Sequence, residues 1–454
     1  MPAILIRILV AVMMVSVIAL RQAAAESVER PNFVFILADD LGWADVAFHQ
    51  GNAPTPHLDQ LAREGLELTQ HTVAPLCSPT RTGLLTGRCW SRFGVTNPQN
   101  GRALPWDTVT LPKALQSIGY DTCLTGKWHL GSLPEWGPNH FGFDHSYGSL
   151  AGGVSPYRHR YKMGPYSQTW HRNEQRIDEP GHVTDLIADE AVKWIETRGD
   201  RPFFLYVPFT AVHLPIHEPQ AWLDRVPMSI QGAVARHYAA CVMHLDQAVG
   251  QIVAALQKQG KLQNTLLVFT SDNGGSTAEN NDPKYPDDHC PNGKLTGNNA
   301  PLRGGKGTLY EGGIRVPTLV HWPRRISAGK NPTPVQIIDW MPTFCSLAGY
   351  TSPTDLKWDG TDLTMLLCKR KELASRPLYT VAPGWRARSL RLENWKLIVT
   401  GEGKARTNEL YDLTQDASET TNRALQEPER VQQMLSLLEN MGSRDRDSVA
   451  SNSE

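Results

Sequence analysis

Short apolar runs alternate with amphipathic stretches along most of this sequence, and this alternation constrains the fold more than any other feature. The runs at 33–37, 120–124, 203–207 and 266–269 have the length and composition of buried strands. The stretches 55–65, 182–195 and 238–256 place apolar residues on one face of a helix. Strands that alternate with helices in this way predict an α/β sandwich.

Each of the four apolar runs is followed by polar residues that are capable of chemistry. In open α/β sheets, ligands bind beyond the carboxyl ends of the strands. We therefore expect these polar residues to share one crevice. In chain order they are Asp39 and Asp40, Lys127 and His129, His213, and Asp272 and Asn273.

The stretch 77–88 joins a reactive side chain, a helix start and a fixed cation. Pro79 suits the first helical position and Ser78 can cap it, so the free amides of the helix should face Cys77. Arg81 adds a planar cation about one turn away, which suits an oxyanion. A thiolate phosphatase loop would separate cysteine and arginine by five residues instead of three. The other alternative is a half-buried cysteine before an ordinary helix.

The two acidic pairs offer only oxygen ligands. Asp39, Asp40, Asp272 and Asn273 suit calcium or magnesium better than zinc. The alternative is that the acids are solvated turn residues or helix caps. Lys127 and His129 are two residues apart, so an extended segment would turn both toward one side, with Trp128 inward.

Four motifs resemble those of the formylglycine-dependent sulfatases: Cys-Ser-Pro-Thr-Arg with Thr-Gly-Leu-Leu-Thr-Gly-Arg, Gly-Lys-Trp-His-Leu-Gly, His-Leu-Pro-Ile-His and Gly-Gly-Lys-Gly-Thr-Leu-Tyr-Glu-Gly-Gly. The resemblance implies an alkaline-phosphatase-like sandwich with a large mixed, mainly parallel sheet between helices. It also implies that a formylglycine-generating enzyme oxidises Cys77 to formylglycine (3-oxoalanine) during maturation. The implied catalytic residues are Cys77, Arg81, Lys127, His129, His213 and Lys306. The implied ligands of one calcium ion are Asp39, Asp40, Cys77, Asp272 and Asn273.

The resemblance implies a sulfuric ester hydrolase of the arylsulfatase type. A hydroxyl of the hydrated aldehyde at residue 77 attacks sulfur, and His213, helped by Lys306, protonates the departing alcohol. His129 then takes a proton from the second hydroxyl, which expels sulfate. We expect a sulfated carbohydrate as substrate. The alternatives are a phosphate or phosphonate monoester hydrolase of the same superfamily, and a non-catalytic binder of anionic glycans with an unmodified Cys77.

The sequence divides into four predicted regions. Residues 1–25 have the basic start, apolar run and small-residue end of a signal peptide. Residues 26–345 form the catalytic domain, in which 132–180 should be loops over the crevice. Residues 346–442 form a small antiparallel sheet, with strands at 378–381, 387–391, 395–399 and 409–413 and a helix at 428–441. Residues 443–454 form a mobile tail.

Composition limits the classes of binding partner and the cellular compartments that we expect for this protein. With 45 basic and 46 acidic residues there is no electrostatic reason to expect a nucleic-acid partner. The signal predicts an exported protein, periplasmic or extracellular and without stable membrane insertion, and the lack of an Asn-x-Ser/Thr acceptor favours a bacterial one. Six of seven cysteines remain besides Cys77, and an oxidising compartment permits disulfides among them. His217 should be structural or at the substrate rim, and His244 and Asp246 should be surface or capping residues.

Overall fold

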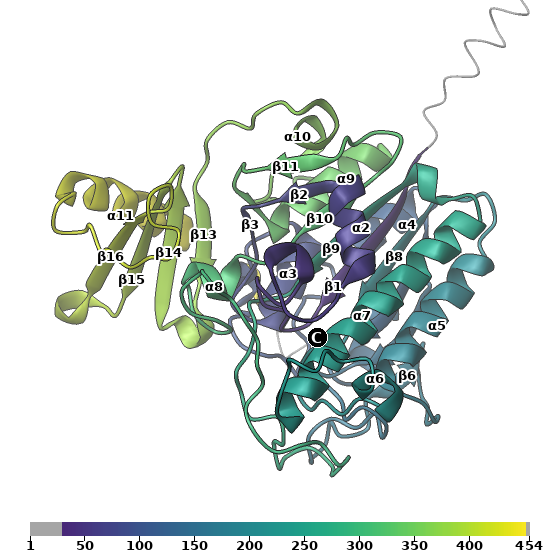
Figure 1. Cartoon of the computed structure of the whole chain (residues 1–454). Coiled ribbons are helices and arrows are strands. Elements are labelled where there is room, and N and C mark those ends of the chain that lie inside the picture. The colour runs from purple at the N-terminus through teal and green to yellow at the C-terminus, as the bar shows by residue number, and fades with distance from the viewer. Residues whose placement is uncertain (1–29, 451–454) are drawn as a thin grey trace, which may run out of the picture.

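A computed structural model of the protein describes residues 30–450. The predicted signal peptide and the last four residues of the predicted tail lie outside the described residues. Two bodies are visible in Figure 1: a large layered body that contains the main sheet, and a smaller one formed by the C-terminal strands and α11.

A ten-stranded sheet forms the centre of the large body, in the order β11-β2-β10-β9-β1-β8-β4-β5-β6-β7. The pairs β9-β1, β1-β8, β8-β4 and β4-β5 are parallel, whereas β2-β10, β10-β9, β5-β6 and β6-β7 are antiparallel. The strands are β1 (Asn32–Ala38), β2 (Leu66–Leu68), β4 (Asp121–Lys127), β5 (His145–Ser149), β6 (Trp170–Arg172), β7 (Gln175–Arg176), β8 (Phe203–Pro208), β9 (Thr265–Ser271), β10 (Leu319–His321) and β11 (Gly329–Asn331).

Helices cover both faces of this sheet, which explains why its central strands are continuously apolar. Along β1, Phe33, Phe35 and Leu37 pack into one core, which also contains residues of α3 (Cys77–Thr86), α4 (Leu111–Ser117) and α9 (Trp340–Ala348). Val34 and Ile36 point to the other face, where α2 (Pro56–Glu64), α5 (Val183–Glu196) and α7 (Ala233–Lys258) pack. The fold is therefore a sandwich with one hydrophobic core on each face of the sheet.

The C-terminal strands form a separate antiparallel sheet in the order β13-β14-β15-β16, against which α11 (Pro428–Gly442) packs. Its strands are β13 (Leu378–Val381), β14 (Ala387–Leu392), β15 (Trp395–Thr400) and β16 (Thr407–Asp412). A parallel pair joins β3 (His71–Thr72) and β12 (Val335–Gln336). The remaining α-helices of the described chain are α6 (Gln220–Leu223), α8 (Glu311–Ile314) and α10 (Thr364–Lys369).

The predicted fold class is confirmed: a mixed, mainly parallel sheet lies between helices, with a small antiparallel sheet and a helix after it. Helix α7 is long and apolar enough to cross a membrane, but 72% of its most apolar stretch is buried inside the protein. Its apolar character is therefore explained by the core.

The structure differs from what the sequence indicated for three less regular parts. The segment 132–180 contains β5, β6 and β7, which extend the main sheet. The start of the tail is docked: Asp447 pairs with Arg92 at 2.6 Å, and the backbone N–H of Ser448 donates to Arg92 O at 2.9 Å. All seven cysteines are free, so no disulfide supports the fold.

Candidate active site

Cys77 is the first residue of α3, and the helix is capped by the extended Leu76. The predicted cap was wrong, because Ser78 lies inside the helix. Its hydroxyl donates to His129 O at 2.8 Å and accepts from the backbone N–H of Gln99 at 3.0 Å. Ser78 thus ties the start of α3 to the segment after β4. Cys77 still lies at the N-terminus of the helix, which is a favourable place for an anion.

The two acidic pairs meet because β1 and β9 are parallel neighbours. The register pairs Ala38 with Ser271, so the residues that follow the two strands lie side by side. The Asp40 backbone N–H donates to Asp272 Oδ1 at 3.3 Å, and Asn273 Nδ2 donates to Asp40 Oδ1 at 2.8 Å. Ligand atoms of Asp39, Cys77 and Asp272 lie within 4.8 Å of one another. The structure thus brings together all five residues that the resemblance assigns to a metal.

This cluster fits a hard divalent cation. Asp39 Oδ1 and Asn273 Oδ1 are buried without a hydrogen-bond partner among the described residues. Burial, and next the Asp272 carboxylate, raise the pKa of Asp39 to about 8 although Lys127 opposes the shift. Unsatisfied oxygens among crowded carboxylates are the arrangement that a bound cation stabilises.

Three cations surround the acidic cluster, one from each of three motifs. Arg81 Nη2 donates to Asp272 Oδ2 at 2.8 Å, and both side chains are fully buried. Lys127 Nζ lies 2.6 Å from Asp39 Oδ2, also without exposure. Lys306 Nζ lies 2.7 Å from Asp40. Burial would raise the pKa of Asp40, but Lys306 and then His213 hold it at about 2.

The formal side-chain charges of the site sum to zero, because three cations face three carboxylates. A bound divalent ion would therefore give the pocket a net positive charge. Such a pocket favours an anionic ester, and it favours most the transition state in which charge develops on the ester oxygens.

Two histidines border the same space. His129 is 2% exposed, and neither ring nitrogen has a hydrogen-bond partner among the described residues. His213 Nδ1 donates to Leu214 O, which leaves Nε2 at 3.9 Å from Asp40 Oδ2. Burial is the main cause that lowers the pKa of both rings well below the ordinary range, followed by Lys127 for His129 and by Lys306 for His213. Before substrate binds, these effects disfavour the protonated form of both rings.

An unmodified Cys77 would be a poor nucleophile here. Burial raises the pKa of its thiol, although Lys127 opposes the shift. The thiolate, which is the reactive form, is thus disfavoured. This argues against a thiolate phosphatase.

Sequence reasoning missed Thr80 at this site. Its hydroxyl donates to Asp272 O at 2.6 Å and so holds the end of β9 against α3. Thr80 stands between Pro79 and Arg81 in the cysteine motif, and its position in that motif was the only available signal.

A second buried group of titratable residues connects α5, the segment 213–219 and α7. His244 was predicted at the surface, but it is 2% exposed, with Nδ1 at 2.8 Å from Glu218 Oε2 and Nε2 at 2.8 Å from Asp185 Oδ1. Burial would lower its pKa, yet Asp185 and Glu218 raise it to about 9. His182 accepts the backbone N–H of Thr184 at Nδ1, so its hydrogen is on Nε2. His244 therefore pairs with two carboxylates and links these three parts of the chain.

Two other predicted residues have structural roles. Asp246 was predicted to be a surface or capping residue. It is 1% exposed and caps α2 by accepting the backbone N–H groups of His57 at 3.2 Å and Leu58 at 2.8 Å. His217 hydrogen-bonds to Asp288 O at 2.8 Å, as a structural residue would.

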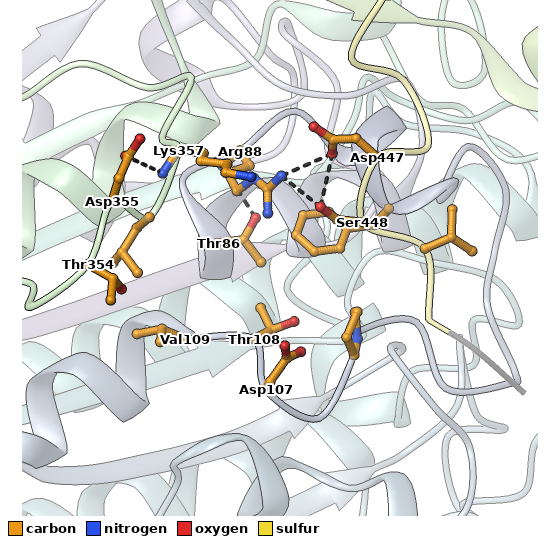
Figure 2. A pocket seen from close by; sticks show the side chains of 14 residues that line it. Thr86, Arg88, Asp107, Thr108, Val109, Thr354, Asp355, Lys357, Asp447 and Ser448 are labelled. Atoms are coloured by element: carbon orange, nitrogen blue, oxygen red, sulfur yellow. Dashed lines mark hydrogen bonds and ion pairs between the residues drawn. The ribbon is translucent and has the colours of Figure 1, made fainter. Parts of the chain in front are cut away.

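A cavity of about 460 Å³ lies near the other end of α3 (Figure 2). Arg88 crosses it to Asp447 at 3.0 Å and to Ser448 at 2.8 Å. Since a ten-residue helix is about 15 Å long, this cavity is separate from the site at Cys77. Arg88 is thus already paired with a carboxylate of the docked tail.

Comparisons with known proteins identify the family of the chain. A family model described as Sulfatase matches residues 31–350, and one described as N-sulphoglucosamine sulphohydrolase, C-terminal, matches residues 305–445. The chain is 32% identical to arylsulfatase J of Mus musculus over 414 residues, 84% of this chain and 66% of that protein. It is 34% identical to N-acetylgalactosamine-6-sulfatase of Mus musculus over 386 residues, 80% of this chain and 70% of that protein.

Two solved structures share the fold over almost the whole chain. Ps i-CgsB in complex with k-i-k-neocarrahexaose has a TM-score of 0.81 and 30% identity, and the match covers 93% of this chain and 95% of that one. The PsFucS1 sulfatase from Pseudoalteromonas sp. has a TM-score of 0.77 and 26% identity, with 97% and 96% covered. The fold and its neighbours define the alkaline-phosphatase-like class. Within it, the chain belongs to the sulfatase family and so to the sulfuric ester hydrolases.

Proposed function

We propose that this protein hydrolyses sulfate monoesters of glycans, with formylglycine at residue 77 and one bound calcium ion. The observation that carries the proposal is the position of Cys77, at a helix N-terminus and within 4.8 Å of Asp39 and Asp272 ligand atoms. The three cations paired with the acidic cluster support a substrate with an anionic head group. Two relatives favour a glycan: one is named N-acetylgalactosamine-6-sulfatase, and one was solved with k-i-k-neocarrahexaose.

The calcium ion and the formylglycine would each supply one kind of chemistry. Calcium, held by Asp39, Asp40, Asp272, Asn273 and residue 77, would act as a Lewis acid toward the sulfuryl oxygens. Formylglycine, as its hydrate, would supply an oxygen nucleophile and a second hydroxyl whose loss of a proton releases sulfate.

The chain's own residues would bind the ester and move its protons. Lys127 and Lys306 lie at hydrogen-bond distance from the cluster and would neutralise charge on the sulfuryl oxygens, together with Arg81. His213, which has Lys306 close to it, would protonate the leaving alcohol from Nε2; because Nδ1 keeps its hydrogen on Leu214 O, this step needs the imidazolium form, which the negative charge of the bound ester would favour. His129, whose ring nitrogens have no hydrogen-bond partner among the described residues, would accept a proton from residue 77 when sulfate leaves.

A comparison of esters tests the proposal. Purified, matured protein should release sulfate from at least one member of a panel of sulfated mono- and oligosaccharides, and from 4-nitrophenyl sulfate. Turnover of 4-nitrophenyl phosphate should be far slower. Faster cleavage of the phosphate ester would favour the phosphate or phosphonate hydrolase instead. Binding of sulfated sugars without any hydrolysis would favour the glycan-binding protein.

The maturation and compartment complete the proposal. A formylglycine-generating enzyme would convert Cys77 before folding, because the side chain is only 2% exposed in the folded protein. We also propose export by the signal at 1–25, to the periplasm or the cell exterior, without stable membrane insertion. Secretion of the chain with this segment removed is the result expected.

A further inference from the structure

Tyr285 is a largely buried tyrosine whose hydroxyl has no hydrogen-bond partner among residues 30–450. The residue lies in the loop between β9 and α8 and is 6% exposed. Its Oη is not among the fully buried polar atoms without a partner, so solvent can reach it. Tyrosine hydroxyls at the edge of an apolar environment usually make a hydrogen bond. The partner of this one is therefore expected to be water or a bound molecule.

The hydroxyl lies beside the catalytic candidates. A Cβ placed on Gly153 would be 2.8 Å from Tyr285 Oη and 3.2 Å from His213 Nδ1. A Cβ placed on Gly152 would be 2.4 Å from His129 Nε2. A single point beside Gly153 is thus close to both the Tyr285 hydroxyl and the His213 ring, and the adjacent Gly152 adjoins His129. Tyr285 Oη therefore lies near His213, on the Nδ1 side of its ring, where one bound sugar can reach both residues.

Two loops hold Tyr285 in this place. Lys162 Nζ is 3.2 Å from Asp282 Oδ2, and the Met163 backbone N–H donates to Lys284 O at 2.7 Å. The ring of Tyr161 packs edge-on against Tyr285, with 5.8 Å between the centroids. The ring is thus fixed from the segment 132–180, which was expected to lie over the crevice. A fixed ring with a free hydroxyl is preorganised for a polar ligand.

The hydroxyl is a donor at every relevant pH. Burial and then Tyr161 raise the pKa of Tyr285 well above its ordinary value, and Asp39 and Cys77 contribute in the same direction. A tyrosine in this state presents an O–H to the crevice. The hydroxyls and ring oxygen of a sugar can accept that hydrogen, whereas the ring of a simple aryl sulfate has no such acceptor beside the ester.

We propose that Tyr285 is a specificity-determining residue that donates a hydrogen bond to the sugar carrying the sulfate. The proposal rests on the proposed function, and it adds the residue that separates sulfated sugars from aryl sulfates. A neutral hydrogen bond of this kind contributes a factor of about 3 to 10 in kcat/KM.

The Tyr285→Phe variant tests this, because it removes only the hydroxyl and keeps the ring contacts. We expect kcat/KM to fall about 3- to 10-fold on the best sulfated sugar of the panel and to stay within about twofold on 4-nitrophenyl sulfate. Tyr161→Phe, the same change on the neighbouring ring, should leave both rates unchanged. Thermal unfolding of both variants checks that the fold is kept.

Two results would overturn the proposal. An unchanged rate of Tyr285→Phe on the sugar would show that the hydroxyl makes no contact with it. An equal loss on both substrates would assign the hydroxyl to the positioning of His213. A wild-type protein that hydrolyses neither substrate would instead contradict the proposed function itself.

Discussion

The buried His244 makes a pH-dependent contribution to stability that can be worked out from its contacts. Its two nitrogens are bound to Glu218 and Asp185, which raise the pKa from the ordinary value of 6.5 to about 9. A raised pKa means that the folded state holds the proton more tightly than the unfolded state. The stabilisation is therefore complete below pH 6.5 and is lost as the pH rises through 9.

The magnitude follows from the size of the shift. One pKa unit corresponds to about 1.4 kcal/mol, so the full shift corresponds to about 3 kcal/mol. Asp185 is half exposed, with 52% of its side chain accessible, and solvent screens that contact. We therefore expect the free energy of unfolding to lose about 2 to 3 kcal/mol from this residue between pH 6.5 and pH 10.

Urea unfolding of the wild type and of His244→Gln at several pH values measures this contribution. The difference in unfolding free energy between the wild type and His244→Gln should be largest near pH 6.5 and should shrink by about 2 to 3 kcal/mol by pH 10. His171→Gln is the matched control, because burial lowers the pKa of His171 to about 4 and its folded state is neutral throughout that range. The difference in unfolding free energy between the wild type and His171→Gln should stay constant above pH 7. A His244→Gln gap that is equally large at pH 7 and pH 10 would refute the reasoning.

Three further predictions concern the site and its support. Arg81→Lys should lower kcat on an aryl sulfate about 100-fold or more, because a lysine cannot reproduce the planar contacts of the guanidinium; an unchanged kcat would contradict this role. Asp39→Asn should weaken calcium binding at least about tenfold in a titration of chelator-treated protein, and equal affinities would remove Asp39 from the ligand set. Lys396→Met should cost about 3 to 5 kcal/mol in chemical unfolding, because it leaves the buried Glu311 without its 2.8 Å partner. Lys258→Met removes a surface pair of the same length and should change stability little; comparable losses would show that burial does not decide the effect.

The sequence predicted the position of the acidic cluster because that position follows from local pattern and topology together. Asp39 and Asp40 end one apolar run, and Asp272 and Asn273 end another. If both runs form parallel strands, the two pairs meet only when those strands are neighbours in the sheet. The sequence does not show which strands are neighbours. The structure supplies this adjacency through the pairing of β1 with β9.

The cap of α3 could not be predicted from the sequence, because a remote group decides it. Ser78 has the composition and position of a cap, but its hydroxyl is used by His129 O and the backbone of Gln99. The helix therefore starts two residues earlier than the local signal indicates, at Cys77 instead of Pro79. Contacts between residues far apart in the chain override a local preference worth about 1 kcal/mol.

The environment of His244 was missed for a similar reason. Its helix shows one apolar face in the sequence, which suggests that a polar residue elsewhere on it faces water. In the structure the ring stacks on Trp222 and is bound to Glu218, which lies 26 residues earlier in the chain. A side chain buried by a distant loop leaves no periodic signal in its own helix.

The chemical state of residue 77 tests the central claim most directly. Peptide mass analysis of active, folded protein should show an aldehyde at position 77, and hydrolysis of sulfate esters should rise in proportion to the fraction converted. Cys77→Ala, which has no side-chain heteroatom to convert into the aldehyde, should lose turnover. A protein that cleaves sulfate esters at full rate with an ordinary thiol at position 77 would contradict the account.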